Sequence, residues 1–265
     1  HNQLLPTASG AGKLLFVDAF SGIAGDMLVG ALLDLGVPIG TIEAALDPLP
    51  LSGYKIQTSW IERSGIAATR FQVVVTENQP ARDWADIRTL LEAAEQLTEG
   101  ARGLALRAFE ILARAEAEVH GTSPEAVHLH EVGAVDSIVD TVAAAVALDY
   151  LGALVMGSPL PVGRGLIQTR HGPLPAPAPA TVLCLRGVPT YEAGIDEELV
   201  TPTGAALLTA AASGYTRWPS LQSEQVGWGA GIRELPDRPN LLRLVLGSEN
   251  DSGWRGIPGS DAGFV

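Results

Sequence analysis

The sequence predicts an α/β fold, a mixed sheet with flanking helices and a helical segment near residues 83–150. Short apolar runs alternate with segments whose apolar residues recur every three to four positions, a pattern typical of α/β proteins. The first run, at 14–17, continues through a glycine-containing loop into a helix expected at 27–35. Between residues 83 and 151 the helical pattern is almost continuous.

The other expected strands are bounded by turn residues. Residues 54–61 and 71–75 are joined around Ser64 and Gly65, which predicts a hairpin. Further strands are expected at 153–156, 165–169 and 241–246.

Capping residues predict where the helices begin and end. Gly36 ends the helix at 27–35, and Asp83, with Asp86 in the first turn, begins the next one. Pro179 suits the first turn of a short helix that Gly187 ends. The remaining expected helices are 101–119, 135–151 and about 201–212, with a short helix-start signal at 123–125.

The composition favours one folded unit. The chain has 265 residues, of which 46% are hydrophobic, enough for a sizeable core. We expect one domain over residues 13–248, with a helical subregion at about 83–151, and a loose tail at 249–265. The single cysteine, Cys184, excludes an intramolecular disulfide framework and a cysteine-based zinc cluster, and its apolar surroundings predict a core position.

Charge and hydropathy limit the classes of partner. The net charge of −13 argues against binding to nucleic acid or to an anionic membrane surface. The polar start at 1–13 does not resemble a secretory signal, and carboxylates interrupt the apolar stretch at 141–156. A cytoplasmic protein with no membrane span is the expectation.

The loop that follows the first strand carries a phosphate-binding pattern. Asp18, Ser21, Gly22, Gly25 and Asp26 lie between a strand and a helix, where backbone N–H groups can approach an anion. Asp26 would repel a phosphate unless a cation lay between them, so Asp18 and Asp26 are candidates for a divalent cation. A tight turn with a helix cap explains the same residues without a ligand.

A second cluster has the composition of a metal site. His128 and His130 face the same side of an extended segment, and imidazole is a good ligand for nickel, zinc, copper and iron. Glu131 follows directly, and Asp136 and Asp140 share one face of the next helix. The alternative is structural: Asp136 caps the helix, Asp140 meets solvent, and the histidines make core hydrogen bonds.

Two weaker candidates lie further along the chain. His171, next to Arg170 on a loop stiffened by prolines, suits an anionic substrate or a plain surface turn. Thr201 and Thr203 precede a helix, where helix capping explains a hydroxyl without any ligand.

Four segments, at 16–27, 127–140, 171–181 and 198–206, together resemble the LarC family of nickel-insertion proteins, over about residues 14–247. The resemblance implies insertion of Ni²⁺ into pyridinium-3,5-bisthiocarboxylic acid mononucleotide, giving the nickel-pincer nucleotide of lactate racemase. It also implies a lyase-class nickel chelatase that consumes CTP with Mg²⁺ or Mn²⁺, and a homo-oligomer. The C-terminal region that handles CTP in that family is absent from this sequence, and residues 78–83 lack the histidine-rich stretch common in members.

We assign roles to the candidate residues on this basis. For nickel we expect His128, His130 and Asp140, and for proton transfer His130, Glu131 and Asp136. For the nucleotide and an accompanying cation we expect Asp18, Ser21, Gly22, Gly25, Asp26, His171, Thr201 and Thr203. Two alternatives remain: a non-catalytic nickel-binding subunit that needs a separate CTP-binding partner, and a metal-dependent hydrolase using His128, His130, Asp136 and Asp140.

Overall fold

The computed structural model describes residues 3–77, 82–127, 129, 133–169 and 172–249. It confirms the α/β class: a seven-stranded mixed sheet has the strand order β2-β3-β10-β11-β1-β4-β9. These strands are β1 (Leu14–Asp18), β2 (Tyr54–Arg63), β3 (Ile66–Val75), β4 (Leu154–Gly157), β9 (Gly214–Tyr215), β10 (Leu221–Ala230) and β11 (Leu241–Glu249). β1 is parallel to β4 and antiparallel to β11, so the sheet is mixed at its centre.

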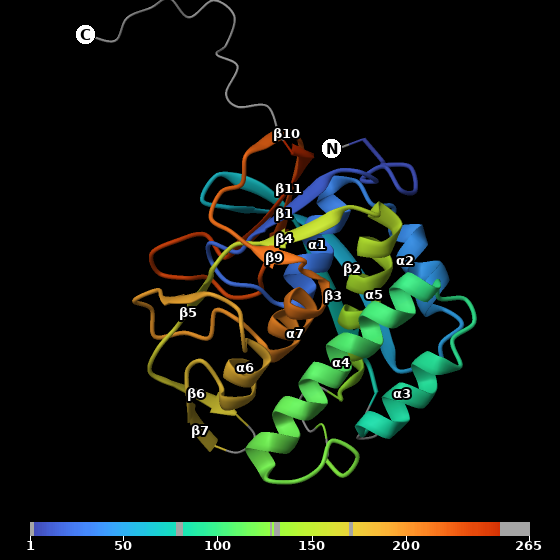
Figure 1. Cartoon of the computed structure of the whole chain (residues 1–265), viewed down its shortest axis with the longest axis vertical. Coiled ribbons are helices and arrows are strands. Elements are labelled where there is room, and N and C mark those ends of the chain that lie inside the picture. Colours follow the sequence, from blue (N-terminus) through green and yellow to red (C-terminus); the bar gives the residue numbers. More distant parts are fainter. Residues whose placement is uncertain (1–2, 78–81, 128, 130–132, 170–171, 250–265) are drawn as a thin grey trace, which may run out of the picture.

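The helices and two small sheets surround this main sheet. The helices are α1 (Gly25–Leu35), α2 (Ile39–Leu46), α3 (Trp84–Glu92), α4 (Glu99–His120), α5 (Val135–Leu151), α6 (Pro179–Cys184) and α7 (Pro202–Ala211). The small sheets pair β5 (Leu160–Val162) with β8 (Thr190–Glu192), and β6 (Leu166–Thr169) with β7 (Gly172–Pro175). In Figure 1, α2, α3, α4 and α5 gather on the right, and β1, β4, β9, β10 and β11 lie above them and to the left.

Helix α1 lies directly on the sheet because β10 presents glycine to it. A Cβ atom at Gly229 would lie 1.8 Å from the carbonyl oxygen of Met27. Asp34 then ties the helix to two strands, since it accepts hydrogen bonds from the Trp228 N–H (2.8 Å) and from Thr69 Oγ1 (3.1 Å). These contacts determine where the N-terminus of α1 lies.

The predicted helical segment is confirmed and forms much of the core. Asp83 caps α3 through a capping box with Asp86, and Thr98 caps α4 by accepting from the Ala101 N–H. Helix α5 is buried along most of its length, with apolar residues packed against α4, α1 and α2. Cys184 is buried as expected, and burial raises the pKa of its thiol to about 12.

Three local predictions are corrected. Two elements are not expected from the sequence. Helix α2 follows Pro38 after a break of only a few residues, and β10 carries glycines where a usual strand has apolar residues. The helix-start signal at 123–125 yields a single turn, closed by the Ala126 and Val127 N–H groups on the Ser123 carbonyl. No helix follows because Val127 and Leu129 are buried at a spacing of two.

Within the described ranges, no helix combines the length and apolar character that a membrane crossing requires. The limits of the expected domain remain predictions. The strand β11 runs through Glu249, and the rest of the expected tail lies outside the described residues.

Candidate functional site

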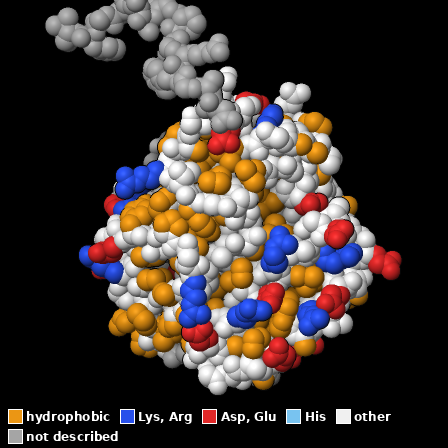
Figure 2. All heavy atoms as spheres, viewed as in Figure 1, with side chains coloured by type: hydrophobic (Ala, Val, Ile, Leu, Met, Phe, Trp, Pro, Cys, Tyr) orange, Lys and Arg blue, Asp and Glu red, His pale blue; other side chains and the backbone are white. Residues whose placement is uncertain are grey.

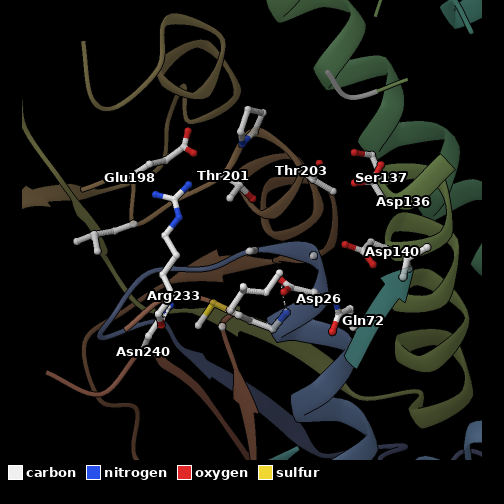
Figure 3. A pocket seen from close by; sticks show the side chains of 18 residues that line it. Asp26, Gln72, Asp136, Ser137, Asp140, Glu198, Thr201, Thr203, Arg233 and Asn240 are labelled. Atoms are coloured by element: carbon white, nitrogen blue, oxygen red, sulfur yellow. Dashed lines mark hydrogen bonds between the residues drawn. The ribbon is translucent and has the colours of Figure 1, made fainter. Parts of the chain in front are cut away.

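A cavity of about 360 Å³ opens where the N-terminal ends of α1, α5 and α7 meet. Figure 3 shows carboxylates from α1 and α5 on one side of it, the hydroxyl residues Thr201 and Thr203 above, and Arg233 on the opposite side. A helix N-terminus carries partial positive charge and unpaired N–H groups, so three of them together attract anionic groups.

The three helix ends can meet because two of them have a glycine in the first turn. A Cβ atom at Gly25 would lie 2.9 Å from the Cβ atom of Asp140 and 3.2 Å from Cγ2 of Thr203. A Cβ atom at Gly204, in the first turn of α7, would lie 2.3 Å from the carbonyl oxygen of Ile23. Gly25 and Gly204 are therefore required because a side chain at either position would keep the helix ends apart.

Asp140 is the most unusual group in the cavity. Asp140 is half-buried, its carboxylate accepts from the Asp26 N–H, and its Oδ1 atom is buried and has no hydrogen-bond partner among the described residues. Burial raises the pKa of Asp140 well above its ordinary value, and the charges of Asp26 and Asp136 raise it further. Asp140 thus lies at the wall of the cavity with one carboxylate oxygen inaccessible to solvent.

Asp26 shares this environment. Burial raises its pKa to about 6, although the Met27 N–H, which donates to its Oδ1 at 2.8 Å, and the charge of Arg70 act in the opposite direction. Asp136, in the first turn of α5, also lines the cavity. Because burial raises the pKa of Asp26 and of Asp140, a cation that binds between these two carboxylates would displace protons from them.

The opposite side of the cavity carries polar groups, the guanidinium of Arg233 and the carboxylate of Glu198. Thr201 Oγ1 accepts from the Gly204 N–H at 3.1 Å, so Thr201 caps α7 while facing the cavity. Arg233 pairs with Glu197 at 3.2 Å, and its carbonyl accepts from Asn240 Nδ2 at 3.0 Å. Sequence reasoning missed Arg233 and Asn240, because the connection between β10 and β11 carries no recognisable motif.

The structure separates the members of the predicted phosphate loop. Gly25 and Asp26 line the cavity, but the Asp18 carboxylate is paired with Arg243 and lines a different one. Ser21 donates to the Pro239 carbonyl at 2.7 Å. Asp18 and Asp26 therefore do not flank one cation as expected, because Arg243 already neutralises Asp18.

Gly22 has a packing role in this loop. Its φ is 100°, and a Cβ atom there would lie 1.8 Å from the Leu199 carbonyl oxygen. The N–H groups of Gly22 and Ile23 donate to the Ala19 and Leu199 carbonyls. The backbone N–H groups of these two residues are therefore already hydrogen-bonded to carbonyl groups of the protein.

His128, His130, Glu131 and His171 lie outside the described residues. Their neighbours are described: Leu129 is buried, and the Gly133 N–H donates to the Leu129 carbonyl just before α5 begins. In the part of the chain that the structure describes, no three His, Cys, Asp or Glu side chains are grouped so as to hold a metal ion.

The chain is similar to proteins of known family. It is 48% identical over 239 residues to the pyridinium-3,5-bisthiocarboxylic acid mononucleotide nickel insertion protein of Nocardioides sp., covering 90% of this chain and 61% of that protein. It is 45% identical over 248 residues to the protein of the same name in Geobacillus kaustophilus, covering 89% and 60%.

A relative in Geobacter metallireducens, whose name also describes nickel insertion, is 51% identical over 238 residues, covering 89% of this chain and 61% of the relative. The chain thus spans about 61% of the length of these relatives. No solved structure matches the chain. The nickel insertion protein family matches residues 15–257, and the chain belongs to that family.

Proposed function

We propose that this chain forms the part of a nickel-insertion protein that binds Ni²⁺ and presents it to pyridinium-3,5-bisthiocarboxylic acid mononucleotide. The names of the Nocardioides and Geobacillus relatives support the substrate. The product is the nickel-pincer nucleotide of lactate racemase, and the whole protein acts as a CTP-dependent nickel chelatase of the lyase class. CTP with Mg²⁺ or Mn²⁺ binds to the C-terminal region, in the same or a separate subunit, and the assembly is a cytoplasmic homo-oligomer.

The observation that carries this proposal is the Asp140 carboxylate, whose buried Oδ1 has no hydrogen-bond partner among the described residues, beside a cavity that Asp26 and Asp136 also line. An ionised carboxylate buried without a partner is costly, and a divalent cation removes that cost. Carboxylate oxygen and imidazole nitrogen both bind Ni²⁺. We assign the remaining donors to His128 and His130, which precede α5 closely in the sequence.

The distribution of charge in the cavity fits the proposed substrate. Asp26, Asp136 and Asp140 line one side, and Arg233 lies on the other side with Glu198 beside it (Figure 3). A mononucleotide with a cationic ring and an anionic phosphate has the complementary distribution. The phosphate would lie near Arg233 and Thr203, and the ring near Asp26 and Asp140, with His171 on the anionic side of the substrate.

The proposed reaction exchanges ligands on nickel. Oxygen and nitrogen donors hold Ni²⁺ less strongly than thiolates do, so transfer to the two softer thiocarboxylate sulfurs is downhill. A nickel–carbon bond replaces the C–H bond of the pyridinium ring, and the released proton needs an acceptor. Asp136 lines the cavity, and with Glu131 and His130 it is the proposed acceptor group.

Calorimetric titration with Ni²⁺ tests the site. Asp140→Asn and the pair His128→Ala/His130→Ala should each weaken nickel binding at least about tenfold, since each removes a ligand. Glu92→Gln, an exposed carboxylate paired with Arg88 on α3, is the matched control and should bind nickel as the wild type does. Unchanged affinity in both site variants would overturn the assignment.

A reconstitution experiment separates the alternatives. The chain is mixed with the CTP-binding region of a longer relative, Ni²⁺, CTP and the thiolated mononucleotide, and the nickel product is followed by its absorbance. Formation of the product only with both parts supports the proposal. Nickel binding without any contribution to turnover would favour a non-catalytic subunit, and phosphoester cleavage by the metal-loaded chain alone would favour a hydrolase.

A further inference from the structure

A second and larger cavity, of about 740 Å³, lies on another part of the molecule. It is formed by the end of β1, the β4–β5 connection, the segment leading into β8, and the residues that follow β9. It shares no described lining residue with the cavity that holds Asp26 and Asp140. Figure 2 shows hydrophobic side chains gathered in the region where Figure 1 labels β9 and β5.

The inner side of this second cavity is built around Arg243. Its guanidinium is paired with Asp18 and lies 4.9 Å from the ring centre of Trp218 and 6.0 Å from that of Phe20. On β10, Trp228 lies 5.4 Å from the same group. Arg243 is therefore held by one carboxylate and three aromatic rings, and this arrangement supports Trp218 from below.

The outer side presents aromatic surface to solvent. Trp218 is 53% exposed and Tyr191 is 46% exposed, and both line the cavity. Large aromatic side chains at this exposure next to a cavity are typical of a binding site rather than of scattered surface residues. An indole ring supported on one side and open on the other suits stacking with a planar ring.

The charge of the second cavity is opposite to that of the whole chain. Arg217 and Arg243 line it against the single carboxylate of Asp18, whereas the chain carries a net charge of −13. Arg217 is exposed and has no ion-pair partner among the described residues. A free guanidinium next to a stacking surface attracts an anionic group on the same ligand.

We propose that this second cavity binds a mononucleotide, whose planar ring stacks on Trp218 beside Tyr191 and whose phosphate pairs with Arg217. The proposal rests on residues outside the first cavity, so it can be tested separately from the assignment of the nickel site. The same chemistry has two sources: a pyrimidine nucleotide, and a pyridine nucleotide that resembles the proposed substrate. The ligand is recognised by a ring and an anion together, so neither part alone should bind well.

Equilibrium titration of the chain with cytidine monophosphate and with nicotinic acid mononucleotide tests this site. Trp218→Ala and Arg217→Ala should each weaken binding roughly tenfold or more, and Trp218→Phe should restore part of the loss. Cytidine and inorganic phosphate, each tested alone, should bind more weakly than the mononucleotide. The preferred mononucleotide then identifies the source of the ligand.

Matched variants keep the test specific. Trp60, 64% exposed on β2, and Arg107, exposed on α4, lie outside both cavities, so Trp60→Ala and Arg107→Ala should bind as the wild type does. Retention of wild-type binding in both Trp218→Ala and Arg217→Ala would overturn the proposal, as would no binding of either mononucleotide at about 1 mM.

Discussion

Gly25, the first residue of α1, lies directly against Asp140 of α5: a Cβ atom on Gly25 would be 2.9 Å from the Asp140 Cβ atom and 3.1 Å from Oδ2. This contact closes the inner end of the first cavity, and the backbone N–H of the next residue, Asp26, donates to the Asp140 carboxylate. The position of a backbone atom on one helix therefore determines the environment of a carboxylate on another.

We predict that Gly25→Ala lowers the free energy of unfolding by about 1–3 kcal/mol, because the added methyl group overpacks the contact with Asp140. Gly40→Ala on α2 is the control, since a Cβ atom there meets nothing within 4 Å. That change should be neutral or stabilise the protein by up to about 1 kcal/mol. Urea denaturation of both variants checks the prediction, and equal stabilities would contradict it.

Stability should depend on pH through Asp26. Its folded-state pKa is about 6, against an ordinary value of 3.8. Between these values the folded protein holds a proton that the unfolded chain has lost, so the free energy of unfolding falls as pH rises through this range. The stabilisation is complete below about pH 4 and lost above about pH 6.

Between about pH 4 and pH 6, the fall in the free energy of unfolding should be smaller in Asp26→Asn than in the wild type by on the order of 2 kcal/mol. Urea denaturation at pH 4, 5, 6 and 7 in the presence of a chelator measures it. Glu92→Gln, on the exposed face of α3, should keep the wild-type slope. A wild-type slope in Asp26→Asn would show that another group is responsible.

Nickel should stabilise the folded protein, if the proposed function holds. A ligand that binds only the folded state adds about 2.7 kcal/mol to the free energy of unfolding when its free concentration is 100 times its dissociation constant. A chelator that removes Ni²⁺ should reverse this gain. Asp140→Asn should lose most of this gain, because the amide supplies no anionic oxygen to the cation. Thermal melts with and without Ni²⁺ measure the effect, and an equal gain in the variant would exclude Asp140 as a ligand.

Asp34→Ala should destabilise the fold by about 1–3 kcal/mol, since it leaves the partly buried Trp228 N–H without this acceptor and releases Thr69. The strands β3 and β10 are paired only at Gly229 and Thr69 in the described part of the sheet, so this tie matters. Nickel affinity should fall less than twofold, because Asp34 lies near the other end of α1. A loss of stability below about 0.5 kcal/mol would contradict this role.

Local patterns were enough to predict several elements. Asp83 and Asp86 predicted the start of α3, and Ser64 and Gly65, both with positive φ, predicted the turn between β2 and β3. The strand β10 was missed because Gly227 and Gly229 lack the apolar side chains that a strand pattern requires. Glycine is needed at these two positions because α1 packs directly against them. That contact joins segments far apart in the sequence, so it produces no local periodic pattern.

The candidate site was predicted in part. Asp26, Asp136, Asp140, Thr201 and Thr203 were chosen from separate motifs, and the structure brings all of them to one cavity. Arg233 and Asn240 lie in a connection without a motif. Asp18 belonged to the same motif as Asp26 but faces the opposite side of the sheet, where Arg243 neutralises it.

The sequence by itself determined the α/β class, the helical segment, the caps and the residue types able to bind a cation, because these depend on periodicity and on side-chain chemistry within a few residues. Only the tertiary structure decided that the N-termini of α1, α5 and α7 meet at one cavity, that Oδ1 of Asp140 is buried there, and that Asp18 is paired with Arg243. Burial and ion pairing depend on segments more than 100 residues apart, such as Asp26 and Asp140 or Asp18 and Arg243. Glycines at the points of contact let those segments approach closely enough for one helix to set the electrostatics of another.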